Sequence, residues 1–379
     1  MNLPSVLSAV AGAALVLVIL WDAFETILVP RRIGRRVRLT RWFYVLAWRI
    51  WRALARRVEK PADREAMLGF FGPLSLLLLL GVWAIGLIVA FALLAMATHG
   101  PNEAPRAFTT WLYMSGETFF TLGFGDVTPA TAAGRAIAVF EAGTGFGFLG
   151  TVVGYLPTMY GGFAQRELEI SLMDARAGSP PTAAEFLRRT PPSENGRLRD
   201  DLLASWERWS AQLLETHISY PQLAYYRSQH TNQSWLAALV AILDSTALLL
   251  ARGKEETTSQ ASLTFAMARH ALVDVTQIFV HALPAEREDR LPTAAFRLLR
   301  ERLESAPGAL PDDPGFESRL AALRLRYEPY AQALAAHLLF ELPPWTHEAP
   351  RRDNWQGGPW DKMLSSHREP AHRSEEHFG

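Results

Sequence analysis

The chain has no cysteine among its 379 residues, which excludes disulfides, thiolate metal sites and a cysteine nucleophile. Lysine is nearly missing too, because arginine supplies all but three of the 38 basic residues: Lys60, Lys254 and Lys362. The sequence also lacks a phosphate-binding loop, a dinucleotide-binding glycine pattern, a nucleophile elbow and the spacing of a zinc site. These absences indicate a protein that is not an enzyme, holds no organic cofactor and has no nucleic-acid partner.

The formal net charge of zero conceals one strongly basic segment. From Arg31 to Arg64, twelve basic residues face only two acidic ones, Glu59 and Asp63, which gives a local net charge of +10. Long apolar runs flank this segment on both sides, a pattern typical of membrane proteins. Because short arginine-rich loops stay on the cytoplasmic side, we expect the N-terminus outside a cell membrane and this loop inside.

Three apolar segments, 5–29, 73–97 and 136–160, are long enough to cross a hydrocarbon core, which needs about 20 residues. The first lies in an N-terminal region, 1–30, that has no basic residue before the apolar run and no small-residue cleavage pattern. These features favour an uncleaved span over a signal peptide. The third span is rich in glycine and returns the chain to the cytoplasmic side, where we expect the remaining residues.

The basic loop, 31–72, is predicted to contain an amphipathic helix over 39–58, in which tryptophans alternate with arginines. Such a helix is suited to the inner membrane interface, where it would bind anionic lipids. Packing of a basic helix on the cytoplasmic domain is the open alternative. In the first span, Asp22 and Glu25 share a helix face, where they are expected to pair with Arg31, Arg32 or Arg35 or, alternatively, to sense protons.

The C-terminal half has a different composition. We expect a linker over 162–195, a helical cytoplasmic domain over 196–344 and a disordered tail over 345–379. Helical periodicity covers 196–217, 234–251, 258–282, 293–305 and 317–340. Residues 235–251 are apolar but only 17 long with polar residues at their middle, which favours a buried core helix over a fourth span. The tail carries four histidines, whose irregular spacing argues against a metal site: His347, His367, His372 and His377.

Between the second and third spans lies a segment that is too short to cross a membrane. Residues 107–120 are mostly apolar and would form a helix of about 20 Å, suited to a re-entrant position. Glycines then alternate with larger residues in the hexapeptide 121–126, Thr-Leu-Gly-Phe-Gly-Asp. Because glycine tolerates a positive φ, alternating glycines let successive carbonyls face one side, where they can replace the hydration shell of a cation.

This hexapeptide resembles the selectivity filter of potassium channels. The resemblance covers residues 73–161 and implies an outer helix, a pore helix, a filter and an inner helix, with four chains around one axis as a homotetramer. It further implies that K⁺ is coordinated by the filter residues Thr121, Leu122, Gly123 and Phe124, followed by Gly125 and Asp126. Glu117 and Asp126 match the carboxylate pair that braces the filter in this family, with Tyr113 and Thr118 as further support.

Two departures from the commonest filter bear on selectivity. Leu122 and Phe124 stand where valine and tyrosine are usual, and phenylalanine lacks the hydroxyl that ties tyrosine to the pore helix. The predicted function is a potassium channel that conducts passively. A less selective cation channel on the same pore and a non-conducting membrane signalling protein remain as alternatives.

The inner helix carries several small residues, including Gly143, Gly145 and Gly150. Close packing between helices explains glycines of this kind, but Gly145 also matches the gating hinge of the family, and Pro157 could kink the helix near its cytoplasmic end. Glu141 is an acid within the span, either paired behind the filter or facing the pore. The first span has no ladder of arginines for voltage sensing, and a gating ligand for the cytoplasmic domain is conceivable but not identified.

Overall fold

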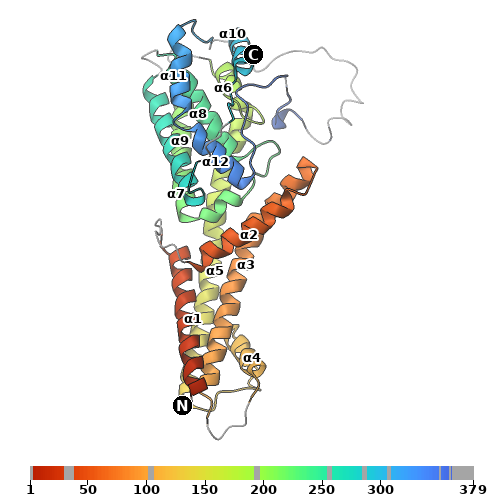
Figure 1. Ribbon diagram of the computed structural model, residues 1–379, viewed down its shortest axis with the longest axis vertical. Coiled ribbons are helices and arrows are strands. Elements are labelled where there is room, and N and C mark those ends of the chain that lie inside the picture. The colour runs from red at the N-terminus through yellow and green to blue at the C-terminus, as the bar shows by residue number, and fades with distance from the viewer. Residues whose placement is uncertain are drawn as a thin grey trace. The chain divides into compact units, whose positions relative to one another are not determined.

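The computed structural model describes all but ten short stretches of the chain, and its regular elements are helices throughout the described residues (Figure 1). The described residues are 3–29, 38–100, 106–191, 197–253, 258–283, 288–304, 309–349, 351–357 and 360. Within them, α1, α3 and α5 are long and apolar enough to cross a membrane. The expectation of an all-α membrane protein with three spans is therefore confirmed.

The chain divides into two compact units, each built from two stretches of sequence. Unit 1 comprises 1–164 and 216–227, and unit 2 comprises 165–215 and 228–379. Unit 1 contains α1 (Leu3–Ile27), α2 (Leu39–Ala55), α3 (Pro61–Ala97), α4 (Phe108–Phe119), the first part of α5 (Ala132–Ala177) and the 3-10 helix η1 (Pro221–Tyr225). Unit 2 contains the end of α5, then α6 (Ala183–Arg189), most of α7 (Arg197–Ser219), α8 (Trp235–Ala251), α9 (Thr258–Phe279), α10 (Thr293–Glu304), α11 (Pro314–Arg324), α12 (Glu328–Leu338) and the 3-10 helix η3 (Asn354–Gln356).

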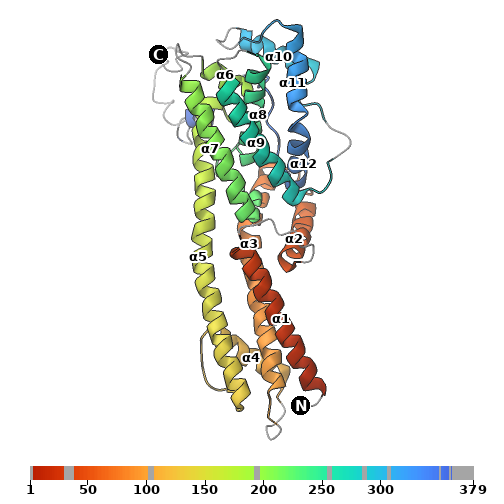
Figure 2. The same cartoon turned by 90° about the vertical axis from the view of Figure 1, so that its left-hand side faces the viewer.

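In unit 1, α1 and α3 run side by side and pack along most of their length (Figures 1 and 2). Glycine makes this approach close: a Cβ atom at Gly12 would lie 2.7 Å from the carbonyl oxygen of Ala90, and one at Gly86 would lie 2.5 Å from Ile19. Small residues at such contacts let membrane helices pack through their backbones. The first span is thus fixed to the second by van der Waals packing.

Helix α5 is 46 residues long, about 70 Å at 1.5 Å per residue and roughly twice the thickness of a hydrocarbon core. The expected span ended at residue 160 and a linker followed it, whereas the structure continues the helix to Ala177. Residues 163–176 are mostly strong helix formers and include no proline or glycine. The helix ends at Gly178, which has a φ of 89° and is followed by Pro180 and Pro181.

The expected linker also contains α6, whose N-terminus is capped by the Thr182 hydroxyl accepting from the Glu185 amide at 3.2 Å. Residues 192–196 of that linker lie outside the described residues. Further on, the expected helix over 317–340 is two helices, α11 and α12, because Pro329 occupies the first turn of the second.

Helix α8 forms the centre of unit 2, where it packs against α6, α9, α11 and α12. All its residues except Leu250 are buried in protein, as expected for a core helix rather than a span. The carboxylate of Asp244 within it is paired with the Arg290 guanidinium at 2.7 Å and accepts a hydrogen bond from the Tyr327 hydroxyl at 2.5 Å. This pairing offsets the cost of burying a charge in the middle of an apolar helix.

Part of the expected disordered tail is packed against unit 2. Trp345 is 1% exposed, and Asp353 forms an ion pair with Arg189 at 2.6 Å. His347 contacts the carbonyl oxygen of Pro180 at 3.2 Å, and no group of three acidic or histidine side chains suited to a metal occurs within the described residues. The other tail histidines, like Arg31, Arg32 and Arg35, lie outside those residues.

Acid is expected to weaken unit 2 through Asp289. A hydrogen bond from Arg324 at 2.5 Å lowers the pKa of Asp289 below its ordinary value. The bond therefore stabilises the fold at pH values above the ordinary aspartate pKa, and this stabilisation is lost as the pH falls through the lowered value. In thermal unfolding, D289N should melt below the unsubstituted protein at neutral pH, and the difference should vanish in strong acid. An equal difference at both pH values would contradict this role.

Candidate pore and selectivity filter

The site begins with α4, a helix of 12 residues that is too short, at about 18 Å, to cross a membrane. It packs against α3 (Figure 2) and buries one face, which carries Trp111, Met114, Ser115, Glu117 and Phe119. The helix ends where Phe120 donates its amide to the carbonyl of Gly116 at 3.0 Å. The chain then enters the segment that the sequence singles out, residues 121–126.

In this segment the backbone alternates between two conformations. Thr121, Gly123 and Gly125 have positive φ angles of 57°, 62° and 78°, whereas Leu122 and Phe124 do not. Such alternation turns successive carbonyls towards one side of the chain, as the glycine spacing predicts. The side chains of Leu122 and Phe124 are 58% and 67% exposed in the single chain.

Thr121 is held in an unfavourable region for an L-residue, at a cost of about 1–2 kcal/mol. Two backbone hydrogen bonds stabilise this turn: Thr121 donates to the carbonyl of Thr118 at 3.1 Å, and Leu122 donates to that of Glu117 at 2.8 Å. The side chain of Thr118 turns back to the helix and donates to the Met114 carbonyl at 2.8 Å. The end of α4 therefore fixes the beginning of the filter segment.

Carboxylates brace the segment through separate partners. Glu117 is buried and accepts a hydrogen bond from the Phe124 amide at 3.2 Å, whereas Asp126 accepts one from the Tyr113 hydroxyl at 3.3 Å. The resemblance implied a direct pair between Glu117 and Asp126, and no such hydrogen bond occurs among the described residues. Both carboxylates nevertheless tie residues 124–126 to α4.

Helix α5 contacts α4 at two points one turn apart. Ser115 hydrogen-bonds both to the Glu141 carboxyl and, at 2.7 Å, to the Ile88 carbonyl, so that one hydroxyl joins α3, α4 and α5. Glu141 is 1% exposed in the single chain, and a position behind the filter stays a prediction. Sequence reasoning missed Ser115, because serine in an apolar helix has no distinctive signal.

The second contact is at Gly145. A Cβ atom there would lie 2.0 Å from the carbonyl oxygen of Phe119, so only glycine fits. Gly143 and Gly150 have open space, and Pro157 lies within the continuous helix. The geometry thus shows close packing at Gly145, while a hinge at this position stays a prediction.

The two acids near the end of α1 join it to the start of α2 and to the middle of α3. Asp22 accepts hydrogen bonds from the Trp83 indole at 3.0 Å and from the Thr40 hydroxyl at 2.5 Å. Glu25 lies 3.4 Å from the Arg38 guanidinium. The charged partner in the described residues is therefore Arg38, and the contact with Trp83 could not be predicted because Trp83 is distant from Asp22 along the chain.

Helix α2 packs on unit 1 through one face and exposes the other. The buried ring of Trp48 lies 4.8 Å from Phe71 and 5.0 Å from Tyr225. The exposed face combines apolar and basic side chains: Trp42, Leu46, Ile50 and Leu54 at intervals of four residues, with Arg41, Arg49 and Arg56. An exposed face of this composition is suited to a membrane interface.

Residues 216–227 belong to unit 1 although they follow unit 2 residues in sequence. The ring of Tyr225 stacks on Tyr44 of α2 with 5.8 Å between centroids, and burial raises the pKa of Tyr225 above its ordinary value. The side-chain amide of Gln222 donates to the Tyr155 hydroxyl of α5. This segment thus connects the inner helix to α2, a long-range contact that no periodic pattern could indicate.

Comparisons with known proteins agree with this geometry. Residues 77–160 match the family described as "Ion channel", and the match includes most of the second span, α4, the filter segment and the beginning of α5. The chain is also 24% identical to the uncharacterized membrane protein YdjJ of Bacillus subtilis (strain 168) over 251 residues, which are 64% of this chain and 70% of that protein. No solved structure is significantly similar to the chain. This protein is therefore a membrane protein whose residues 77–160 match the ion channel family.

Proposed function

We propose that this protein is a potassium channel that conducts K⁺ passively through a filter formed by four identical chains. The observation that carries the proposal is the alternation of positive φ at Thr121, Gly123 and Gly125. Carbonyls turned to one side can form successive rings around a shared axis and replace the hydration shell of the ion. The hydrogen bonds from the Phe124 amide to Glu117 of α4 and from the Tyr113 hydroxyl of α4 to Asp126 would hold these carbonyls in place while ions pass.

Exposed apolar side chains support an assembly in a membrane. The first part of α5 carries Val139, Phe146 and Val153, each more than 60% exposed in the single chain. Lipid or neighbouring chains would cover such surfaces in a membrane protein. The arginine-rich loop 31–72 favours a cytoplasmic location for that loop, for unit 2 and hence for the end of the chain, with the N-terminus outside a cell membrane.

A less selective cation channel is the second candidate, and Phe124 favours it. Phenylalanine has no hydroxyl to donate to α4, and the bond that joins residue 124 to Glu117 of α4 comes from its backbone amide. The reversal potential of reconstituted protein in asymmetric K⁺ and Na⁺ separates the two. We expect it to follow the K⁺ equilibrium potential, with block by barium as the resemblance implies. Equal permeability would favour the less selective channel, and no current would favour a non-conducting signalling protein.

The exposed face of α2 is expected to bind anionic lipid. Each arginine near an anionic surface contributes about 1 kcal/mol, so R49Q/R56Q should bind short-chain phosphatidylserine at least about tenfold more weakly in detergent solution. The matched control is R208Q/R297Q, which removes two exposed arginines from unit 2 and should leave the affinity unchanged. Equal affinity of the two double variants would show that α2 is not the lipid site.

A further inference from the structure

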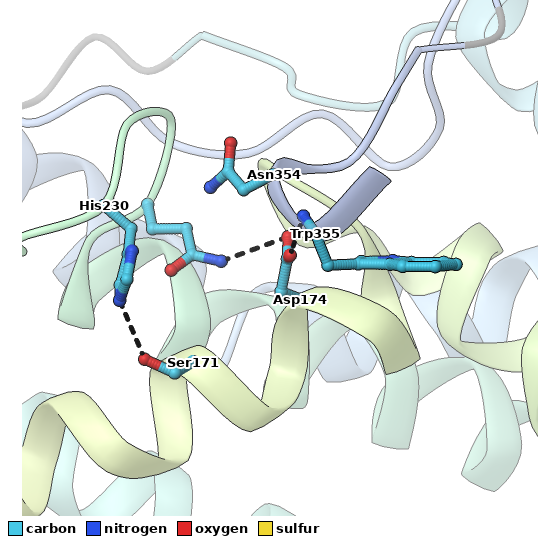
Figure 3. A pocket seen from close by; sticks show the side chains of 6 residues that line it. Ser171, Asp174, His230, Asn354 and Trp355 are labelled. Atoms are coloured by element: carbon cyan, nitrogen blue, oxygen red, sulfur yellow. Dashed lines mark hydrogen bonds between the residues drawn. The ribbon is translucent and has the colours of Figure 1, made fainter. Parts of the chain in front are cut away.

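A cavity in unit 2 borders the last turns of α5. Its volume is ≈ 200 Å³, and it is lined by Ser171, Asp174, His230, Gln233, Asn354 and Trp355. Figure 3 shows Ser171 and His230 on one side of Asp174 and the ring of Trp355 on the other. A single water needs about 10–15 Å³ of such a volume, so the cavity has room for a small organic molecule.

The carboxylate of Asp174 lies at this cavity without a counter-charge of its own. Asp174 is 7% exposed, and its oxygens accept hydrogen bonds from the Trp355 amide at 3.0 Å and from Gln233 at 3.4 Å, both neutral donors. The nearby guanidinium of Arg189 is paired with Glu185 at 2.9 Å and with Asp353 at 2.6 Å. Within the described residues Asp174 forms no ion pair, although a buried charge is costly unless it is paired.

Gln233, which also lines the cavity, carries an acceptor that lacks a donor. The side-chain oxygen of Gln233 is buried and has no hydrogen-bond partner in the described part of the chain. Leaving such an atom without a donor costs about 1–3 kcal/mol. The Ser171 hydroxyl, 3.0 Å from the His230 ring, adds a further acceptor at the rim.

These groups define the chemistry of a ligand. A buried carboxylate beside an unpaired amide oxygen repels anions and offers acceptors to a group with several N–H donors and a positive charge. A primary ammonium meets both conditions because it carries three donors and one charge. A divalent metal ion is a poor match, since the described residues hold no cluster of three carboxylate or histidine ligands.

We propose that this cavity binds a small primary ammonium compound, of about the size of ethanolamine, and that binding regulates the pore. Ser171 and Asp174 lie on α5, which continues without a break in its helical structure from the residues that contact α4, Glu141 and Gly145. A ligand that stabilises one position of these last turns therefore acts on the inner helix itself. The regulatory part rests on the proposed channel function, whereas the binding part rests on the cavity alone.

Calorimetric titration of the full chain in detergent tests the binding part. In HEPES-buffered potassium chloride, ethanolamine should give saturable heat, and the neutral analogue ethylene glycol should give none. D174N keeps an acceptor for the Trp355 amide but removes the charge, so it should bind ethanolamine at least about tenfold more weakly. The matched control is D312N, which removes a carboxylate from a fully exposed side chain and should bind normally.

A second variant keeps the binding test decisive if D174N does not fold stably. If D174N melts far below the unsubstituted protein, Q233M decides instead, because it replaces the unpaired amide oxygen with an apolar group of similar size and should also weaken binding. Equal affinity for ethanolamine and ethylene glycol would contradict the proposed binding site. Unchanged ethanolamine affinity in D174N, or in Q233M where D174N is unstable, would contradict it as well.

Flux measurements separate the site from the channel. Ethanolamine on the side of unit 2 should change K⁺ flux in vesicles containing the unsubstituted protein and should not change it with D174N. Saturable binding with unaltered flux would overturn the regulatory part and leave the site and the channel standing. Binding without any K⁺ flux under all conditions would instead overturn the proposed function, with the site retained.

Discussion

Replacing Gly123 by alanine is expected to reduce K⁺ flux to the level of empty vesicles without unfolding the protein. Gly123 has a φ of 62°, a conformation that costs an L-residue about 1–2 kcal/mol. An alanine relieves this strain by rotating its peptide groups, which turns the adjacent carbonyls away from the side where the ion would bind. A permeant ion would then lose ligands at two neighbouring levels of the filter.

The space around Gly123 shows that this loss comes from the backbone. A Cβ atom there has no other atom within 4 Å in the single chain, so a loss of flux in G123A would not come from a steric clash within the chain. Gly81, in α3, also has open space around its Cβ position but lies in an ordinary helix, and G81A is the matched control with unchanged flux. Flux through G123A equal to that of the unsubstituted protein would mean that ions take another path.

The alternating φ angles of residues 121–126 were predictable because they depend only on neighbouring residues. Glycines at alternate positions require only neighbouring residues to produce alternating φ angles, and the sequence displays them directly. The positive φ of Thr121 was not predictable in the same way, since threonine rarely adopts it. It arises from the hydrogen bond between the Leu122 amide and the Glu117 carbonyl, which closes the end of α4.

The bracing contacts depended on tertiary structure. The resemblance to potassium channels implied a pair between Glu117 and Asp126, whereas in the structure the Tyr113 hydroxyl donates to Asp126 and the Phe124 amide donates to Glu117. Helix α5 was underestimated because Gly161 and Gly162 resemble a helix end, while the following strong helix formers and the packing of unit 2 continue it to Ala177. Local propensity fixes where helices can form, and packing decides how far they extend.

Helices α4 and α5 are held in register by two contacts that are four residues apart on each helix. Ser115 meets Glu141 and, four residues further on each helix, the carbonyl of Phe119 meets Gly145. Residues four apart lie on one face of a helix, so these contacts form a single seam. The seam ends two residues before the filter begins, and a shift of either helix would therefore be transmitted to Thr121.

Replacing Gly145 by alanine is expected to break this seam. The added Cβ would lie 2.0 Å from the Phe119 oxygen, whereas a carbon and an oxygen in contact stay about 3.3 Å apart, so one backbone must move by about 1 Å or more. Overpacking of this kind costs about 1–3 kcal/mol, which should appear as a lower melting temperature together with reduced flux.

The control for G145A lies two residues away on the same helix. Gly143 has nothing within 4 Å of its Cβ position, so G143A makes the same chemical change without the contact and should keep both stability and flux. The comparison also separates packing from a hinge. If G145A melted normally but altered the voltage or ligand dependence of opening, the glycine would serve as a hinge. Loss of stability and of flux together would show instead that Gly145 is needed because the inner helix touches the backbone that precedes the filter.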